Sequence, residues 1–178
     1  NLQIGCCGAN MHINDSILLE SSIQEGGGSP VSGPLEINNS YVIRTPINLP
    51  AANISLTNSI ISSESASGII FGNGIVTYSN IIGNNEGIGI GITGRAGYNI
   101  GGSVTISNST FIKNAVGLKM TDANVVTVQD NNFFDNTTYV IENRTWKDIV
   151  ATNNYWGTDD PANIAATIFD YYDDINYG

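Results

Sequence analysis

The stretch Val104-Thr105-Ile106-Ser107-Asn108 decides the fold. An apolar residue, a small polar residue, a second apolar residue and another polar residue lead into an Asn. The same order, ending in Asn or Asp, returns at intervals of about 22 residues. Strict alternation of apolar and polar residues is the period of a β-strand with one buried face. We identify the copies at 11–15, 35–39, 54–58, 76–80, 104–108, 126–130 and 149–153.

A unit this short cannot bury its own apolar residues, so we expect the copies to stack as a solenoid of about seven coils. Stacking places Val76, Val104 and Val126 above one another in a continuous core, with Ile106 and Val128 also buried. Asn tolerates the left-handed backbone of a sharp corner, and stacked Asn side chains can hydrogen-bond along a column. The predicted column consists of Asp15, Asn39, Asn58, Asn80, Asn108, Asp130 and Asn153.

The repeat resembles the right-handed parallel β-helix of the pectin-lyase-like superfamily, particularly the short-coil repeats of bacterial and archaeal surface proteins. The resemblance covers nearly the whole chain and implies one all-β domain over 1–178, with coils over 11–157. Its most specific part is 153–161, which looks like a closing coil followed by a capping helix over 158–174. In that helix Asp160 can be the N-cap and Pro161 fits the first turn, and one apolar stripe follows. The stripe consists of Ile164, Ile168 and Tyr172.

Composition and charge narrow the class of protein. A formal charge of −10 on 178 residues argues against a nucleic-acid partner, because only 6 Lys and Arg are present and they form no cluster. No apolar run approaches the roughly 20 residues of a membrane span, so we expect no membrane insertion. The low charged fraction, with abundant Asn, Ser, Thr and Gly, is typical of an extracellular or cell-surface protein. No signal peptide is visible, and we expect a mature product or an excised piece.

The two cysteines, Cys6 and Cys7, are adjacent, which excludes an ordinary loop-closing disulfide within one chain. A vicinal disulfide, free thiols and a bond to a neighbouring chain remain as alternatives. An oxidised form is favoured by the extracellular composition. A zinc site is not expected, because the chain has a single histidine, His12.

Two segments interrupt the repeat. The first, 25–34, is rich in Gly and Pro and is predicted to be a loop. The second, 87–102, contains glycines at the spacing of a dinucleotide-binding loop, but that motif needs a strand before it and a helix after it. Ile88, Ile90 and Ile92 alternate instead as a strand, and we expect Tyr98 on a projecting loop.

The outward positions of the repeated strand offer little chemistry. Cleavage of a glycosidic bond by general acid and base needs two carboxyl groups on one face. The predicted outward row is nearly uncharged, so we expect no hydrolase or lyase activity. His12 beside Glu36 is either a proton-transfer pair or, as we favour, a surface contact between neighbouring coils. The row consists of His12, Glu36, Ser55, Thr77, Thr105, Thr127 and Val150.

Binding remains open on this surface. The exposed hydroxyl row is the kind of face that binds ice or a crystalline polysaccharide, although Thr also suits any exposed strand. We identify Ser55, Thr77, Thr105 and Thr127 as its candidate residues. The aromatic residues Tyr98, Tyr139 and Trp146 are candidates for stacking on sugar rings. A calcium site is also conceivable at the C-terminal aspartates, but these lack the glycine-spaced loop of a dedicated site; they are Asp159, Asp160, Asp170, Asp173 and Asp174.

The sequence therefore favours a non-catalytic, extracellular structural or adhesive module of a cell surface, with self-assembly as a further expectation. Open solenoid ends expose unpaired strand edges, which favour stacking on another copy. A carbohydrate-binding or polysaccharide-degrading β-helix is the alternative, and an ice-binding solenoid is the third hypothesis. We expect a homo-oligomer or filament with no required cofactor.

Overall fold

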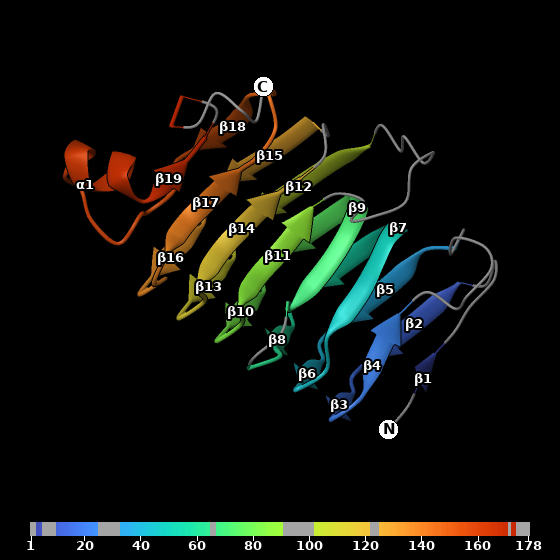
Figure 1. Ribbon diagram of the computed structural model, residues 1–178. Coiled ribbons are helices and arrows are strands. Elements are labelled where there is room, and N and C mark those ends of the chain that lie inside the picture. Colours follow the sequence, from blue (N-terminus) through green and yellow to red (C-terminus); the bar gives the residue numbers. More distant parts are fainter. Residues whose placement is uncertain are drawn as a thin grey trace.

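The protein is a parallel β-solenoid of about six turns with one short helix near the C-terminus (Figure 1). A computed structural model describes residues 3–4, 10–24, 33–64, 67–90, 102–121, 125–170 and 172–173. Each complete coil contributes three short strands, which pair in parallel with the strands of the next coil. The all-β solenoid predicted from the repeat is therefore confirmed.

The repeated motif forms the first stack of strands. Val104 lies beside Val126, and Ile106 lies beside Val128, so like positions face each other along the stack. Two strands continue without a break from the third side of one coil into the first side of the next. The stack consists of β2 (Met11–Asn14), β5 (Leu35–Asn38), the ends of β7 (Ile47–Thr57) and β9 (Ile69–Thr77), β12 (Ser103–Ser107), β15 (Val125–Gln129) and β18 (Ile149–Thr152).

The other two stacks complete the coil. The second consists of β3 (Ile17–Leu19), β6 (Tyr41–Ile43), β8 (Ile60–Ser62), β10 (Asn80–Ile82), β13 (Thr110–Ile112) and β16 (Asn132–Phe134). The third consists of β1 (Gln3–Ile4), β4 (Ser22–Gln24), the starts of β7 and β9, β11 (Glu86–Ile90), β14 (Val116–Met120), β17 (Tyr139–Asn143) and β19 (Ile168–Phe169).

A single hydrophobic core runs along the inside of the coils. Ile106 and Val128 are fully buried, as predicted, while Thr105 and Thr127 are half-buried on the outside. Towards the C-terminus the aliphatic column of the second stack becomes aromatic. The ring of Phe133 stacks on Phe111 at 4.9 Å and on Trp156 at 5.4 Å between centroids. Offset aromatic stacking adds to the stabilisation that burial already supplies.

The predicted register is wrong in one coil. Ile106 lies beside Val76, and Val104 lies beside Gly74, so the fourth copy is 74–78 and not 76–80. The corner residue is Tyr78, with φ of 50°. Asn80 instead begins β10 and lies beside Thr110. Gly74 is required there, because at its φ of 141° an added Cβ would come within 1.9 Å of the Ile54 carbonyl oxygen.

The other six residues of the predicted corner column are placed correctly. Each of the seven corner residues has a positive φ, and the backbone N–H of each corner except the last donates to the carbonyl that ends the first strand of the next coil. Side-chain amides link only the first three corners. The corner column consists of Asp15, Asn39, Asn58, Tyr78, Asn108, Asp130 and Asn153.

The continuous polar ladder lies one residue beyond the corner column, inside the coil, where it was not predicted. In it the backbone N–H of each residue except the last donates to the side-chain oxygen of its counterpart in the next coil, as from Ser79 to Ser109 at 3.2 Å. This first ladder consists of Ser16, Ser40, Ser59, Ser79, Ser109, Asn131 and Asn154. A second ladder after the second stack includes Ser21, Thr45, Ser63, Asn84, Asn114 and Asn136.

The predicted helix over 158–174 is much shorter in the structure. Helix α1 spans Pro161–Ala166 and buries none of its residues, so it does not cover the end of the core. Its N-cap is Asp160, which accepts from the Ala162 N–H, and Pro161 begins the helix, as predicted. Ile168 does not continue a helical stripe, because it lies in β19 beside Ile141 of β17. Among the described residues, the last coil therefore ends in the strand edges of β18 and β19.

Candidate functional site

The predicted hydroxyl row is interrupted. Ser55, Thr105 and Thr127 share one outward row, but Ile75 lies between Ser55 and Thr105 in the place predicted for Thr77. The side chain of Ile75 is 50% exposed. Thr77 belongs to the neighbouring row, where its hydroxyl lies 3.4 Å from that of Thr57. A regular lattice of hydroxyl groups is therefore broken at its centre.

His12 and Glu36 lie side by side on the first two coils. Nδ1 of His12 is 2.8 Å from Oε2 of Glu36, and both side chains are about half exposed at 49%. The pair is a surface contact between neighbouring coils. No second carboxylate joins it at hydrogen-bond distance among the described residues.

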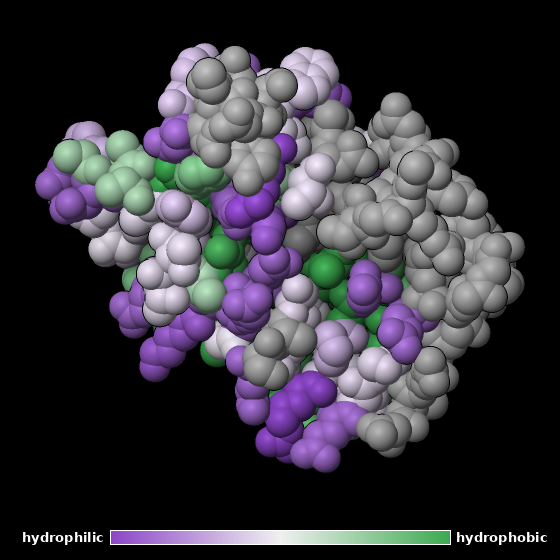
Figure 2. Space-filling view, in the orientation of Figure 1, coloured by the Kyte–Doolittle hydropathy of each residue, from purple (hydrophilic) through white to green (hydrophobic). Residues whose placement is uncertain are grey.

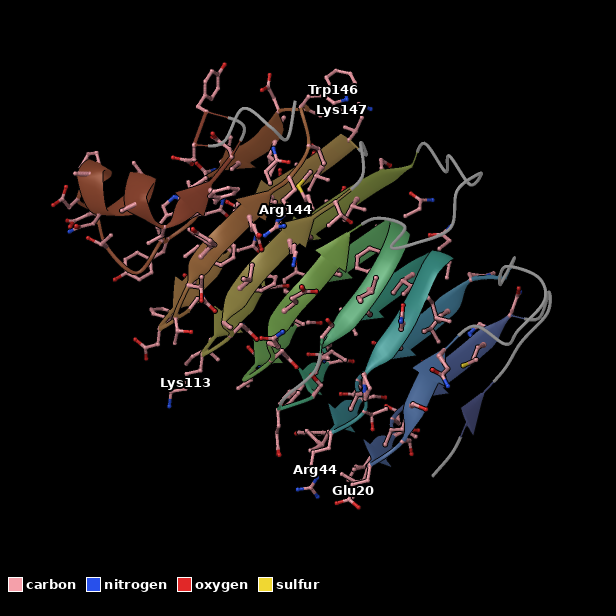
Figure 3. All side chains as sticks on the ribbon, viewed as in Figure 1. Glu20, Arg44, Lys113, Arg144, Trp146 and Lys147 are labelled. Atoms are coloured by element: carbon pink, nitrogen blue, oxygen red, sulfur yellow. The ribbon has the colours of Figure 1, made fainter. Side chains whose placement is uncertain are left out.

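A cluster of charged side chains lies on the outer face of the third stack, which the sequence reading missed. Nζ of Lys119 is 2.6 Å from Oε1 of Glu86 and 3.7 Å from Oε2 of Glu142. Arg144, labelled in Figure 3, pairs with the nearly buried Glu142. Each carboxylate has a cation beside it, which is the arrangement that a buried charge requires for stability. The sequence could have predicted this ion pair, because Lys119 and Glu142 occupy matching positions in successive coils. The two residues lie beside each other in the paired strands β14 and β17.

Figure 2 shows the same side of the molecule as a mainly polar surface with small, separated apolar patches. This face therefore presents no broad apolar surface among the described residues. An opening with an apolar floor lies instead at the C-terminal end of the solenoid.

The opening at the C-terminal end has a volume of about 410 Å³. Its floor consists of apolar residues at core positions, including Ile149, which has no further strand above it among the described residues. Its rim carries Trp146, 69% exposed, with the Lys147 ammonium 5.6 Å from the ring centroid. Figure 3 shows Trp146 and Lys147 projecting together from this end. Trp146 is thus a rim residue of the open core.

A smaller groove of about 210 Å³ lies at the corner column between the second and fourth coils. It contains the exposed rings of Tyr41 and Tyr78 and no charged residue. The sequence reading missed it because the wrong register placed Asn80 at the corner.

Several predicted residues lie outside the part that the structure describes. These are Cys6, Cys7 and Tyr98, together with Asp174 of the possible calcium ligands. Among the described residues no group of three or more His, Cys, Asp or Glu side chains is placed to hold a metal ion. Asp160 caps α1, and Asp173 accepts from the Asp170 backbone N–H at 3.0 Å. No helix in the described part of the chain has the length and apolar character needed to cross a bilayer.

Comparison with known proteins identifies one family. The family model described as "Right handed beta helix region" matches residues 6–155, which is most of the chain. No curated protein matches the chain, and no solved structure matches it either.

Proposed function

This chain belongs to the right-handed β-helix family, and from that premise we propose that it is a non-catalytic structural module of a cell surface which stacks end to end with further copies. The observation that carries the proposal is the open core at the C-terminal end. Ile149 and Trp156 are only half-buried there, and Ala151, at a core position of β18, is exposed.

Unpaired strand edges support the same proposal. Among the described residues β18 pairs only with β15, which leaves its outer edge free to accept another parallel strand. Exposed strand edges are templates for pairing with another chain. A folded domain with such an edge beside an open apolar core gains both hydrogen bonds and burial when a partner coil docks.

The first described coil offers a matching edge. Strand β2 pairs only with β5 among the described residues, and Met11 and Ile13 are half-buried. Both β2 and β18 belong to the first stack, with Met11 in the same column as Ile149 and Ile13 in the same column as Ala151. A second copy docked through β2 would therefore continue the register of the first stack with its own β1 displaced, because β19 already occupies the place that β1 would take in the third stack. Such a head-to-tail contact does not close, and it produces a filament.

A non-catalytic role agrees with the arrangement of the charges. The carboxylates of Glu86 and Glu142 are neutralised by Lys119 and Arg144, and Glu36 is paired with His12. The extracellular, cell-surface location rests on the composition, since the charged fraction is 12% and the net charge is −10. Incubation with neutral and acidic polysaccharides tests this part, because release of oligosaccharides by the pure protein would contradict it.

Two substitutions in β18 test the assembly. Ala151→Asp places a charge at an exposed core position, where folding tolerates it but a docked copy would bury it unpaired. Val150→Asp is the matched control, because Val150 is 54% exposed on the outward face of the same strand. In sedimentation velocity we expect the unmodified protein and Val150→Asp to associate as concentration rises, and Ala151→Asp to stay monomeric. A monomeric unmodified protein, or equal association of all three, refutes end-to-end stacking.

A further inference from the structure

Tyr78 is an exception among the seven corner residues. The other six are Asn or Asp, which tolerate left-handed backbone, whereas a bulky aromatic residue adopts it at a cost in free energy. Tyr78 has a φ of 50°, and its side chain is 64% exposed. Burial of the ring therefore does not account for its presence. Glu20, Arg44 and Lys113 take the same left-handed backbone elsewhere in the chain, so the exposed ring, and not the backbone, is the feature that asks for a role.

Tyr78 also ends the chain of corner amides. Nδ2 of Asn39 donates to Asp15 at 2.6 Å, and Nδ2 of Asn58 donates to Oδ1 of Asn39 at 3.2 Å. An Asn at position 78 would be placed to continue this chain to Oδ1 of Asn58. With Tyr78 there, that oxygen accepts no hydrogen bond among the described residues. The side-chain amide of Asn80, which is exposed, has no partner in the described part of the chain either.

These groups line one groove. Tyr41 comes from the second coil and Tyr78 from the fourth, so they lie about 10 Å apart along the axis. Ile60, from the coil between, lines the groove together with the amides of Asn58 and Asn80. Tyr41 is 52% exposed, so both rings are available to a ligand. The groove thus combines two exposed tyrosines with amide donors and acceptors.

We propose that this groove binds a neutral sugar residue, with Tyr78 stacking on the ring and the amides of Asn58 and Asn80 bonding its hydroxyl groups. Amides both donate and accept, which matches hydroxyl groups, and Tyr offers an apolar face beside a polar edge. No cation lines the groove to bind an acidic sugar or a phosphate, and no anion lines it to bind an amine. The groove is also more polar than the aromatic-lined grooves that bind proline-rich peptides.

The proposal goes beyond the stacking function and uses other residues. The groove lies on coils two to four, whereas the stacking surfaces are the C-terminal end and the edge of β2 in the first coil. Ala151→Asp should therefore bind the sugar as the unmodified protein does. Failure of sugar binding leaves the stacking proposal standing, and failure of stacking leaves this one standing.

Titration by NMR tests the site. Methyl glycosides of glucose, galactose, mannose and N-acetylglucosamine are added to ¹⁵N-labelled Ala151→Asp, which we expect to be monomeric, up to about 50 mM. We expect at least one of them to shift the side-chain amide signals of Asn58 and Asn80, with a dissociation constant of about 1 to 10 mM. Galacturonate and an octaproline peptide are the comparison ligands, and we expect weaker or no shifts with them.

Tyr78→Asn separates binding from folding. It restores the residue type of the column, and Asn tolerates the left-handed backbone better than Tyr does, so folding is retained. Binding should weaken at least tenfold. Ile75→Thr is the matched control, because Ile75 is an exposed apolar residue of the same coil that does not line the groove. It should bind like the parent. No shift with any methyl glycoside, preferential binding of octaproline, or unchanged affinity in Tyr78→Asn overturns the proposal.

Discussion

Asn114 is the most demanding position of the second ladder, and its replacement by Ala tests whether the ladders hold the coils together. Its side chain is fully buried and makes four hydrogen bonds. Oδ1 accepts from the backbone N–H of Asn84 at 3.1 Å and from its side-chain amide at 2.9 Å. Nδ2 donates to the Ile81 carbonyl at 3.0 Å and to Asn136 at 3.1 Å.

The substitution leaves a buried backbone N–H without its partner. A buried donor that loses its partner costs about 1 to 3 kcal/mol, as the Asn84 N–H does, and the Ile81 carbonyl and the side-chain amide of Asn84 each lose one further bond. We therefore expect Asn114→Ala to lower the free energy of unfolding by about 3 to 4 kcal/mol. Asn114→Ser should lose about half as much, because a Ser oxygen accepts the backbone N–H throughout the first four coils of the other ladder.

Urea unfolding followed by far-ultraviolet circular dichroism measures the effect. With a denaturant dependence of about 2 kcal/mol per molar urea, the midpoint of Asn114→Ala should fall by about 1.5 to 2 M. Asn132→Ala is the matched control, because Asn132 is exposed in the next coil and its side chain makes no hydrogen bond among the described residues. Its midpoint should hardly move. A loss below about 1 kcal/mol in Asn114→Ala would show that the ladder contributes little.

Three further outcomes are expected. Ile106→Asp should abolish folding, because an unpaired charge enters the core, whereas Thr105→Asp should fold; soluble, cooperatively unfolding Ile106→Asp contradicts the core assignment. Gly74→Ala should lower the free energy of unfolding, measured by heat or urea, by about 3 kcal/mol or more, and Gly83→Ala should lower it by only about 1 kcal/mol. The reason is that an added Cβ meets backbone atoms at position 74 but meets nothing at position 83. Association should rise with salt in light scattering, because screening reduces repulsion between chains of charge −10; unchanged or weaker association at high salt argues against apolar end contacts.

The register error in the fourth coil has a physical cause. A shift of two residues along a strand keeps every side chain on the same face, so alternation alone cannot choose between 74–78 and 76–80. The distance from the corner to the next buried apolar residue does choose. Asn108 precedes Phe111 by three residues, as Tyr78 precedes Ile81, whereas Asn80 lies immediately before Ile81. The sequence thus contained the signal, but the preference for Asn at corners outweighed it.

The C-terminal region was misjudged for a different reason. The apolar residues Ile164, Ile168 and Tyr172 do recur at helical spacing, and the N-cap at Asp160 is correct. A helical period of only two turns is weak evidence, since pairing with a strand can override it. Ile168 lies beside Ile141, which continues the third stack and satisfies the backbone there. The opening beneath it is a tertiary feature that no local pattern encodes.

The corner column and the first ladder, which lie next to each other at the bend after the first stack, have different roles. This difference explains why Tyr78 is tolerated. The first ladder passes the fourth coil unbroken, from Ser59 to Ser79 and from Ser79 to Ser109, each at 3.2 Å. The amide chain of the corner column stops at Asn58 in the same place. Coil spacing is therefore maintained from inside, and the outer corner can change without disturbing the stack. A side chain placed at such a corner can serve binding, because the residues that hold the coils together lie one position further along the chain.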